Sequence, residues 1–125
     1  MPEGLLLALM ELGAAAFDGV RYAGSAGRRF GPALRRISRV LERGLARSKF
    51  EVQDAELQEL KTQAELLQDA LIQHRTGKAA DDSRIAGLSA RIREIAPSIA
   101  AGRVDHSQAY SLLVEVREIR RAILH

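Results

Sequence analysis

Few side chains in this sequence could carry out chemistry, and none stands in a metal-binding pattern. The 125-residue chain has three histidines and no cysteine. Zinc sites on helices use ligands that share one face, such as two histidines four residues apart. The closest pairs here are Asp69 with His74 and Asp105 with His106, and neither spacing brings both side chains to one helix face. We therefore expect no bound metal ion.

Two glycine-containing segments bear on nucleotide binding. A Walker-type phosphate loop needs glycine where this chain has Ile72 and serine or threonine where it has Ala79, so segment 76–78 does not complete the motif. Gly24 and Gly27 lack the spacing of a dinucleotide-binding fingerprint. The sequence thus predicts no cofactor, no small-molecule substrate and no enzymatic activity.

Charge marks the candidate site. Nine basic residues stand between Arg21 and Lys49 against the single acid Glu42, although the net charge of the whole chain is only +3. On a helical wheel the arginines of 33–47 fall within about 120° of one another, opposite the apolar residues. The candidate residues for binding an anionic partner are Arg28, Arg29, Arg35, Arg36, Arg39, Arg43 and Arg47.

An arginine stripe of this kind can bind several anions. It can contact acidic partner subunits, it can bind nucleic-acid phosphates through helix 33–47, or it can lie on an anionic membrane together with segment 5–20. It can also pair with the acidic segment 51–69 of the same or a neighbouring chain, since residues 50–76 carry six acids against two bases. The sequence leaves these alternatives open.

Three later segments carry apolar residues at alternating spacings of three and four, the pattern of a coiled-coil seam. The pattern predicts helices over about 51–74, 81–96 and 105–124, and their short connections favour antiparallel packing. The residues expected to pack the helices or to mediate oligomerisation are Leu57, Leu60, Leu67, Leu71, Ile85, Leu88, Ile92, Ile95, Leu112, Val116, Ile119 and Ile123.

Local signals set the expected helix ends. The apolar residues of 34–41 are out of phase with the seam that follows, which predicts a break near 44–50. Gly77 is suited to end the helix expected over 51–74. Pro97 predicts that the next helix stops at the preceding residues. Asp105 and Gln108 have the spacing of a capping box, which predicts a helix start.

The first 49 residues are organised differently. The sequence predicts an apolar amphipathic helix over 5–20, a glycine-rich hinge over 24–32, and a basic helix over 33–47. Pro32, at the boundary, is suited to the first position of that helix. Because Glu11 interrupts the apolar run, we expect neither a signal peptide nor a transmembrane span. The protein is accordingly expected in the cytoplasm or in an intracellular or virion assembly.

These patterns together predict an all-α protein. Its N-terminal segment, 1–49, contains amphipathic helices, and 50–125 forms an antiparallel helical hairpin or three-helix bundle with coiled-coil-like seams. The seams carry more apolar surface than we expect a single chain to hide. We therefore expect a non-catalytic assembly or adaptor protein that forms a homo-oligomer or binds a helical protein partner, with nucleic-acid binding and peripheral membrane binding as the alternatives.

Overall fold

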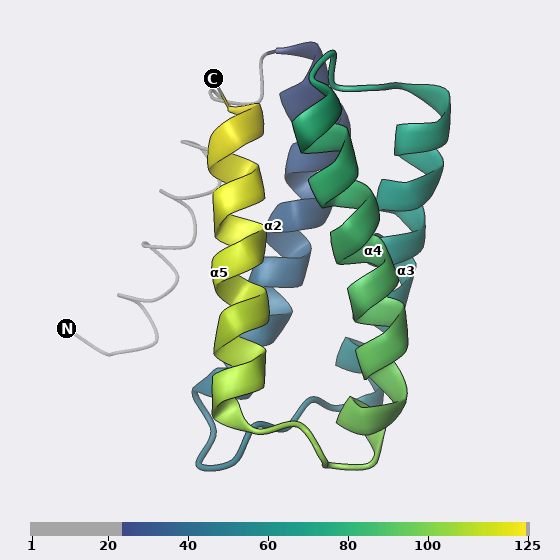
Figure 1. The fold of residues 1–125 in the computed structure, drawn as a ribbon. Coiled ribbons are helices and arrows are strands. Elements are labelled where there is room, and N and C mark those ends of the chain that lie inside the picture. The colour runs from purple at the N-terminus through teal and green to yellow at the C-terminus, as the bar shows by residue number, and fades with distance from the viewer. Residues whose placement is uncertain (1–23, 125) are drawn as a thin grey trace, which may run out of the picture.

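The computed structural model describes residues 24–124, and all regular secondary structure in this part is helical. The helices are α2 (Ser25–Leu45), α3 (Asp54–Gln73), α4 (Ala79–Ala100) and α5 (His106–Ile123). They run alternately down and up, so that helices adjacent in sequence are antiparallel (Figure 1). The helix expected over 5–20 lies outside the described residues.

The helices form a closed bundle in which each packs against two others. Helices adjacent in sequence pack together, and α2 also packs against α5. The expected antiparallel all-α bundle is confirmed, and α2 joins it as an additional member that shares the same core. The seams of α3, α4 and α5 leave one side of the core open, and the apolar side of α2 fills that side.

The start of α2 corrects the hinge expected at 24–32. The helix begins at Ser25 and continues through Pro32, which lies inside it rather than at its first position. Gly27 and Phe30 of this segment are buried. Burying a phenylalanine side chain stabilises the fold by about 1.5–3 kcal/mol. This gain offsets part of the cost of the low helix propensity of glycine and of the hydrogen bond that proline cannot donate.

The chain turns between α2 and α3 over residues 46–53, which overlaps the break expected at 44–50. Gly44 is buried in the last turn of α2, and the ring of Phe50 packs close to it. A Cβ atom on Gly44 would lie 2.7 Å from Phe50 Cε2. The turn therefore depends on a residue without a side chain at this position.

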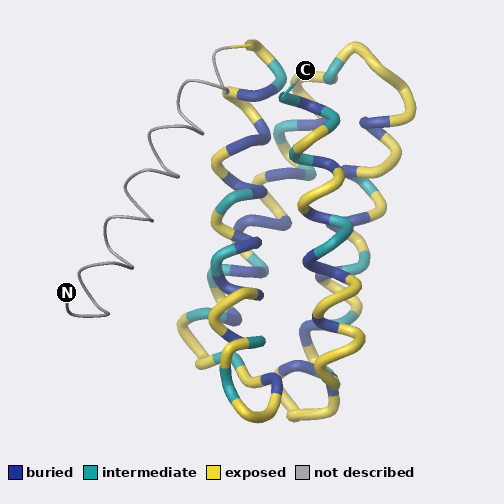
Figure 2. Tube along the Cα trace, turned by 90° about the vertical axis from the view of Figure 1, so that its left-hand side faces the viewer, coloured by how far each residue is buried: buried dark blue, intermediate teal, exposed yellow. Residues whose placement is uncertain are grey.

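The predicted seams form the core of the bundle. All of the predicted packing residues are buried except Ile95, which is half-buried. The residues of α2 that complete this core without any exposed surface are Phe30, Leu34, Ile37 and Leu41. Figure 2 shows buried residues recurring along the inner sides of the helices. The apolar surface of the seams is thus largely covered within one chain.

The end of α4 corrects the stop expected before Pro97. The helix extends three residues past Pro97, and Gly102 with a φ of +69° follows its end. The Gly102 N–H donates to the Ile99 carbonyl at 3.0 Å, and the Arg103 N–H donates to the Ser98 carbonyl at 2.8 Å. This pair of hydrogen bonds is a Schellman motif. The helix continues this far because Ile99 belongs to the core.

The capping box expected at the start of α5 is confirmed. The Gln108 N–H donates to the Asp105 carboxylate at 2.8 Å, and the Asp105 N–H donates to the Gln108 side-chain oxygen at 3.2 Å. These bonds satisfy two backbone donors that have no partner within the helix. The observed bounds of α3 and α5 lie within three residues of the expected ones.

Candidate interaction surface

The outward side of α2 is an arginine face, which we define as Arg28, Arg29, Arg36, Arg39 and Arg43. Arg39 is half-buried and the other four residues are exposed. The opposite side of the helix lies in the core. The bundle therefore anchors α2 by its apolar side and leaves a row of guanidinium groups on its polar side.

The arginine face has no acidic partner among the described residues. The acid of α2, Glu42, accepts a hydrogen bond from Arg117 of α5 at 2.9 Å. The ion pairs found within residues 24–124 involve none of the five arginines of the face. Of the stripe expected from the sequence, Arg47 does pair with segment 51–69, through Glu56 at 3.1 Å.

Two candidate arginines lie apart from this face. Arg35 is half-buried and already engaged in a contact of its own. Arg47 follows the end of α2, and its guanidinium donates to the carbonyl oxygen of Glu51 as well as pairing with Glu56. The Arg47 carbonyl oxygen lies 3.1 Å from His106 Nε2. Arg47 thus holds the connection between α2 and α3 against the start of α5.

The outward side of α3 is an acidic face, which we define as Glu59, Glu65 and Asp69. Glu65 and Asp69 are exposed, and Glu59 is half-buried with a 3.4 Å hydrogen bond from Gln63 Nε2. Leu66 accompanies them with 49% of its surface exposed. An exposed leucine alone is ordinary, but here it lies on the same outward side as a row of carboxylates. The three acids belong to the acidic segment 51–69, which the sequence offered as one possible partner of the arginine stripe.

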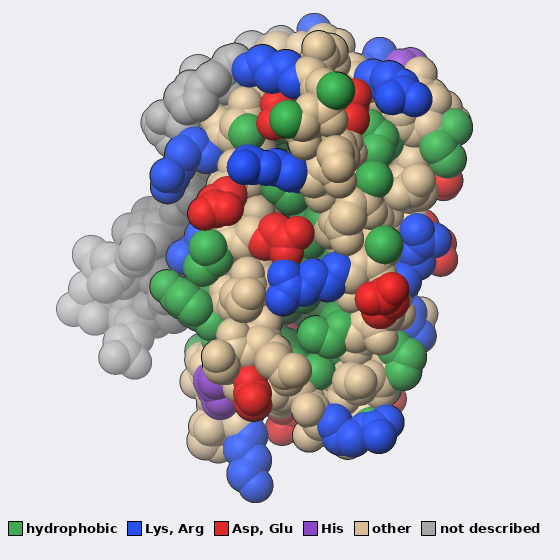
Figure 3. Space-filling model, in the orientation of Figure 1, with side chains coloured by type: hydrophobic (Ala, Val, Ile, Leu, Met, Phe, Trp, Pro, Cys, Tyr) green, Lys and Arg blue, Asp and Glu red, His purple; other side chains and the backbone are tan. Residues whose placement is uncertain are grey.

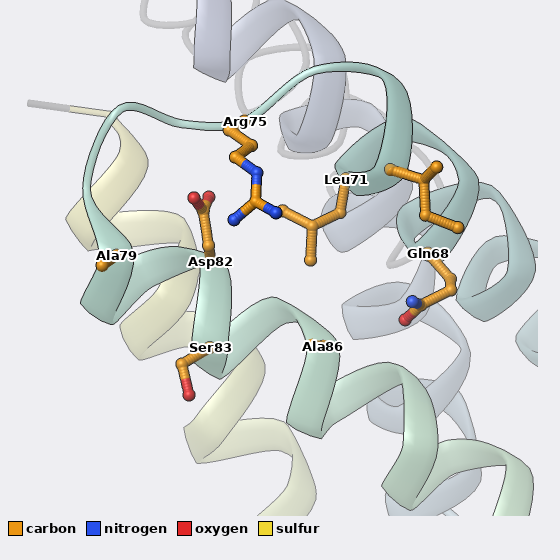
Figure 4. A pocket seen from close by; sticks show the side chains of 8 residues that line it. Gln68, Leu71, Arg75, Ala79, Asp82, Ser83 and Ala86 are labelled. Atoms are coloured by element: carbon orange, nitrogen blue, oxygen red, sulfur yellow. The ribbon is translucent and has the colours of Figure 1, made fainter.

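A groove of about 360 Å³ lies at the surface between α3 and α4, near their connection (Figure 4). Its lining is formed by Gln68, Leu71, Ile72, Arg75, Ala79, Asp82, Ser83 and Ala86. The Asp82 carboxylate accepts hydrogen bonds from Thr76 N at 2.9 Å and Thr76 Oγ1 at 2.7 Å. Figure 4 shows Arg75 extending beside Asp82.

These contacts determine the protonation of Asp82. Hydrogen bonds from Thr76, first from its backbone N–H and then from its hydroxyl, lower the pKa of the Asp82 carboxyl, and the charge of Arg75 lowers it further. A carboxylate held ionised by the turn beside it stabilises the start of α4. Asp82 lies in the first turn of α4 and binds Thr76 of the preceding connection, so the groove is a structural feature of the α3–α4 turn.

The face over α4 and α5 differs from both of these surfaces. Figure 3 shows basic and acidic side chains interspersed along it. Arg91 of α4 pairs with Glu115 of α5, and Arg91 also lies 3.4 Å from Ser111 Oγ. Opposite charges on this face meet within the chain, whereas α2 carries mostly basic residues and α3 mostly acidic ones.

Residues 24–124 contain neither a metal-binding cluster nor a membrane-spanning helix. No group of three His, Asp or Glu side chains in this part of the chain is placed to hold a metal ion. None of the helices α2 to α5 has an apolar stretch long enough to cross a membrane.

Comparison with known proteins adds no relative, because no family model, curated protein or solved structure matches this chain.

Proposed function

We propose that this protein is a non-catalytic assembly protein that binds acidic helical protein surfaces through the arginine face of α2. The observation that carries the proposal is that five arginines project from an anchored helix with no acidic partner among the described residues. A single exposed ion pair contributes only about 0.2–1 kcal/mol. A useful affinity therefore needs a partner that engages several of these arginines together.

The spacing of the arginines favours a helical partner. Arg29, Arg36 and Arg43 recur every seven residues, which is about 10.5 Å along a helix axis. Acids at one heptad position of a second helix recur at the same distance. Because guanidinium groups bind carboxylates in a bidentate geometry, each step of the repeat can form one directed contact.

The surroundings of α2 weaken the two alternative functions. A helix lying on a membrane inserts its apolar side, but Leu34 and Ile37 have no exposed surface in the bundle. Single-stranded nucleic acid is usually held by aromatic stacking as well as by charge, but the aromatic residue of α2, Phe30, is buried. Binding to the phosphates of duplex DNA needs no aromatic residue, so duplex DNA is one of the three probes in the following experiment.

The test compares two variants of the full chain that lose the same charge. The first changes Arg28, Arg29, Arg36 and Arg43 to Gln, and the matched control changes four exposed arginines elsewhere, Arg84, Arg93, Arg103 and Arg121, to Gln. Fluorescence anisotropy measures binding to three probes: a synthetic acidic coiled coil, duplex DNA, and vesicles containing phosphatidylserine. Circular dichroism checks that both variants keep the helical content of the parent.

We expect the parent to bind the acidic coiled coil most tightly. The arginine-face variant should lose about tenfold in affinity, since tenfold corresponds to about 1.4 kcal/mol and four surface pairs together contribute about 0.8–4 kcal/mol. The control variant should stay within about twofold of the parent. Equal losses in both variants, or tightest binding to DNA or vesicles, would contradict the proposal.

A further inference from the structure

We infer that the acidic surface bound by the arginine face is the acidic face of α3 on a second copy of this chain. This inference rests on the proposed function and names the partner. The two copies pack side by side, with α2 of each against α3 of the other. Leu66 lies within the contact and supplies apolar area between the rows of charge.

Both faces are present in one chain but do not meet there. The inner sides of α2 and α3 pack against each other in the core, so the arginine face and the acidic face both point outward. At the connection, Arg47 pairs with Glu56, and none of the ion pairs found within residues 24–124 joins the arginine face to the acidic face. The remaining charges on the two faces can be matched by another molecule.

Symmetry allows both faces to be used at once. Consider a two-fold axis parallel to the helices that lies just outside the layer formed by α2 and α3. Rotation about this axis places α2 over α3 of the second copy and α3 over its α2, whereas an axis across the helices would place α2 over α2. Helix directions are unchanged, so each contacting pair is antiparallel as within the chain (Figure 1). The resulting interface is isologous and closes as a dimer.

The same axis also sets which residues meet, because it preserves height along the bundle. Arg29 lies four residues after the start of α2, and Asp69 lies four residues before the end of α3, so they are level. Arg36 is level with the middle of α3, within about one helical turn of Glu65. Each of these arginines thus has an acid of the second copy within reach of a long side chain.

Arg43, near the lower end of α2, is level with the first turns of α3. Glu59 is the acid of the acidic face about one turn away. The three heptad-spaced arginines and the three acids are therefore matched in order along the interface.

The dimensions predict a weak dimer. A layer of two helices about 30 Å long and about 20 Å wide offers roughly 600 Å² per copy, or roughly 1,200 Å² in total, which is the lower end for specific complexes. Because exposed charges supply most of the contact, salt should weaken it strongly. We expect association that is concentration-dependent and largely lost at 0.5 M salt.

Charge reversal tests the pairing. One variant carries Arg29→Glu, Arg36→Glu and Arg43→Glu, and a second carries Glu59→Lys, Glu65→Lys and Asp69→Lys. Each variant alone should be monomeric in sedimentation equilibrium, because like charges then face each other. An equimolar mixture should form a one-to-one dimer, since every pair is again opposite in sign.

A milder pair of variants tests the position of the interface. Leu66→Ala should weaken self-association several-fold. Ile72→Ala removes a more exposed side chain, 72% against 49%, but one that lines the groove beside α4, and it should leave association unchanged. Both substitutions are at exposed sites and should preserve folding.

Three results would overturn the inference: a parent chain that stays monomeric in low salt at high concentration, a mixture of the reversed variants that does not associate, or assemblies that grow beyond the dimer. If the parent is monomeric while coiled-coil binding still requires the arginine face, the second copy is wrong and the proposed function stands. If the arginine-face variant binds the coiled coil as the parent does, the proposed function itself is wrong.

Discussion

At Gly44 the fold depends on the absence of one methyl group. An added Cβ atom would lie 2.7 Å from Phe50 Cε2 and 3.1 Å from the Glu51 carbonyl oxygen. Both neighbours belong to the connection that brings α3 back against α2. Neither can move without disturbing the turn, because Phe50 is buried in the core and the other atom is backbone.

We predict that Gly44→Ala lowers the free energy of unfolding by about 1–3 kcal/mol, the usual cost of overpacking. Gly87→Ala is the matched control, since Gly87 lies inside α4 with nothing within 4 Å of its added Cβ. That substitution should raise the free energy of unfolding by about 0.5–1 kcal/mol through helix propensity. Urea denaturation measures both, and equal effects of the two substitutions would show that the close contact at Gly44 is unimportant.

Several individual residues were predictable because their signals are local. The capping box of Asp105 and Gln108 needs only two residues three apart. Gly77, which the sequence marked as a helix end, has a positive φ angle but lies in the connection after α3, which ends at Gln73 with His74 as its C-cap. Pro97 was misleading, because its local effect is outweighed by the burial of Ile99 two residues later. Local signals fail where tertiary packing extends a helix past them.

At the scale of elements, the turn between α3 and α4 is held by Asp82 and Thr76. The pKa of the Asp82 carboxyl is lowered by the hydrogen bonds from Thr76 and by Arg75. A group whose pKa is lower in the folded state stabilises the fold in full once the pH is high enough to ionise it in the unfolded chain as well. The stabilisation is therefore present above the ordinary aspartate value of 3.8 and is lost as the pH falls through the lowered value.

We predict that Asp82→Asn is less stable than the parent at pH 7, and that the difference shrinks as the pH falls below 3.8. Urea denaturation at a series of pH values measures the difference. Asp81→Asn is the control, because it removes the neighbouring carboxylate without removing an acceptor of the Thr76 hydrogen bonds. A difference between parent and Asp82→Asn that stays constant with pH would mean that the charge of Asp82 does not stabilise the turn.

The elements differ in how well the sequence predicts them. The heptad seams of α3, α4 and α5 specify which side is buried, so their positions and core residues follow from spacing alone. The first turns of α2 could not be predicted in this way, because their glycines and Pro32 are typical of a hinge. Only the burial of Phe30 in the structure shows why the segment is helical. The exposure of Glu65 and Asp69 was predictable from the sequence, since both stand outside the seam. Whether these acids pair with arginines of the same chain could not be predicted without the position of α2.

For the whole molecule, closure of the bundle by α2 and α5 was the arrangement that spacing could not predict. The hydrogen bond between Glu42 and Arg117 joins residues 75 positions apart. Periodicity shows that α2 has an apolar side but not which helices cover it. Once α2 is in the bundle, the seams are covered within the chain, and the candidate contact surface shifts from the seams to the charged outer faces.

If the arginine face of α2 is the contact surface, its guanidinium groups lose access to solvent on association, and arginine-selective footprinting measures that loss. The full chain is labelled with phenylglyoxal when dilute and when concentrated, in low salt, and mass spectrometry measures the labelling rate at each arginine. We predict that Arg29, Arg36 and Arg43 become protected as the concentration rises, while the exposed control arginines Arg84 and Arg93 do not. Labelling rates that do not change, or that fall equally at all five positions, would show that the arginine face is not the contact surface.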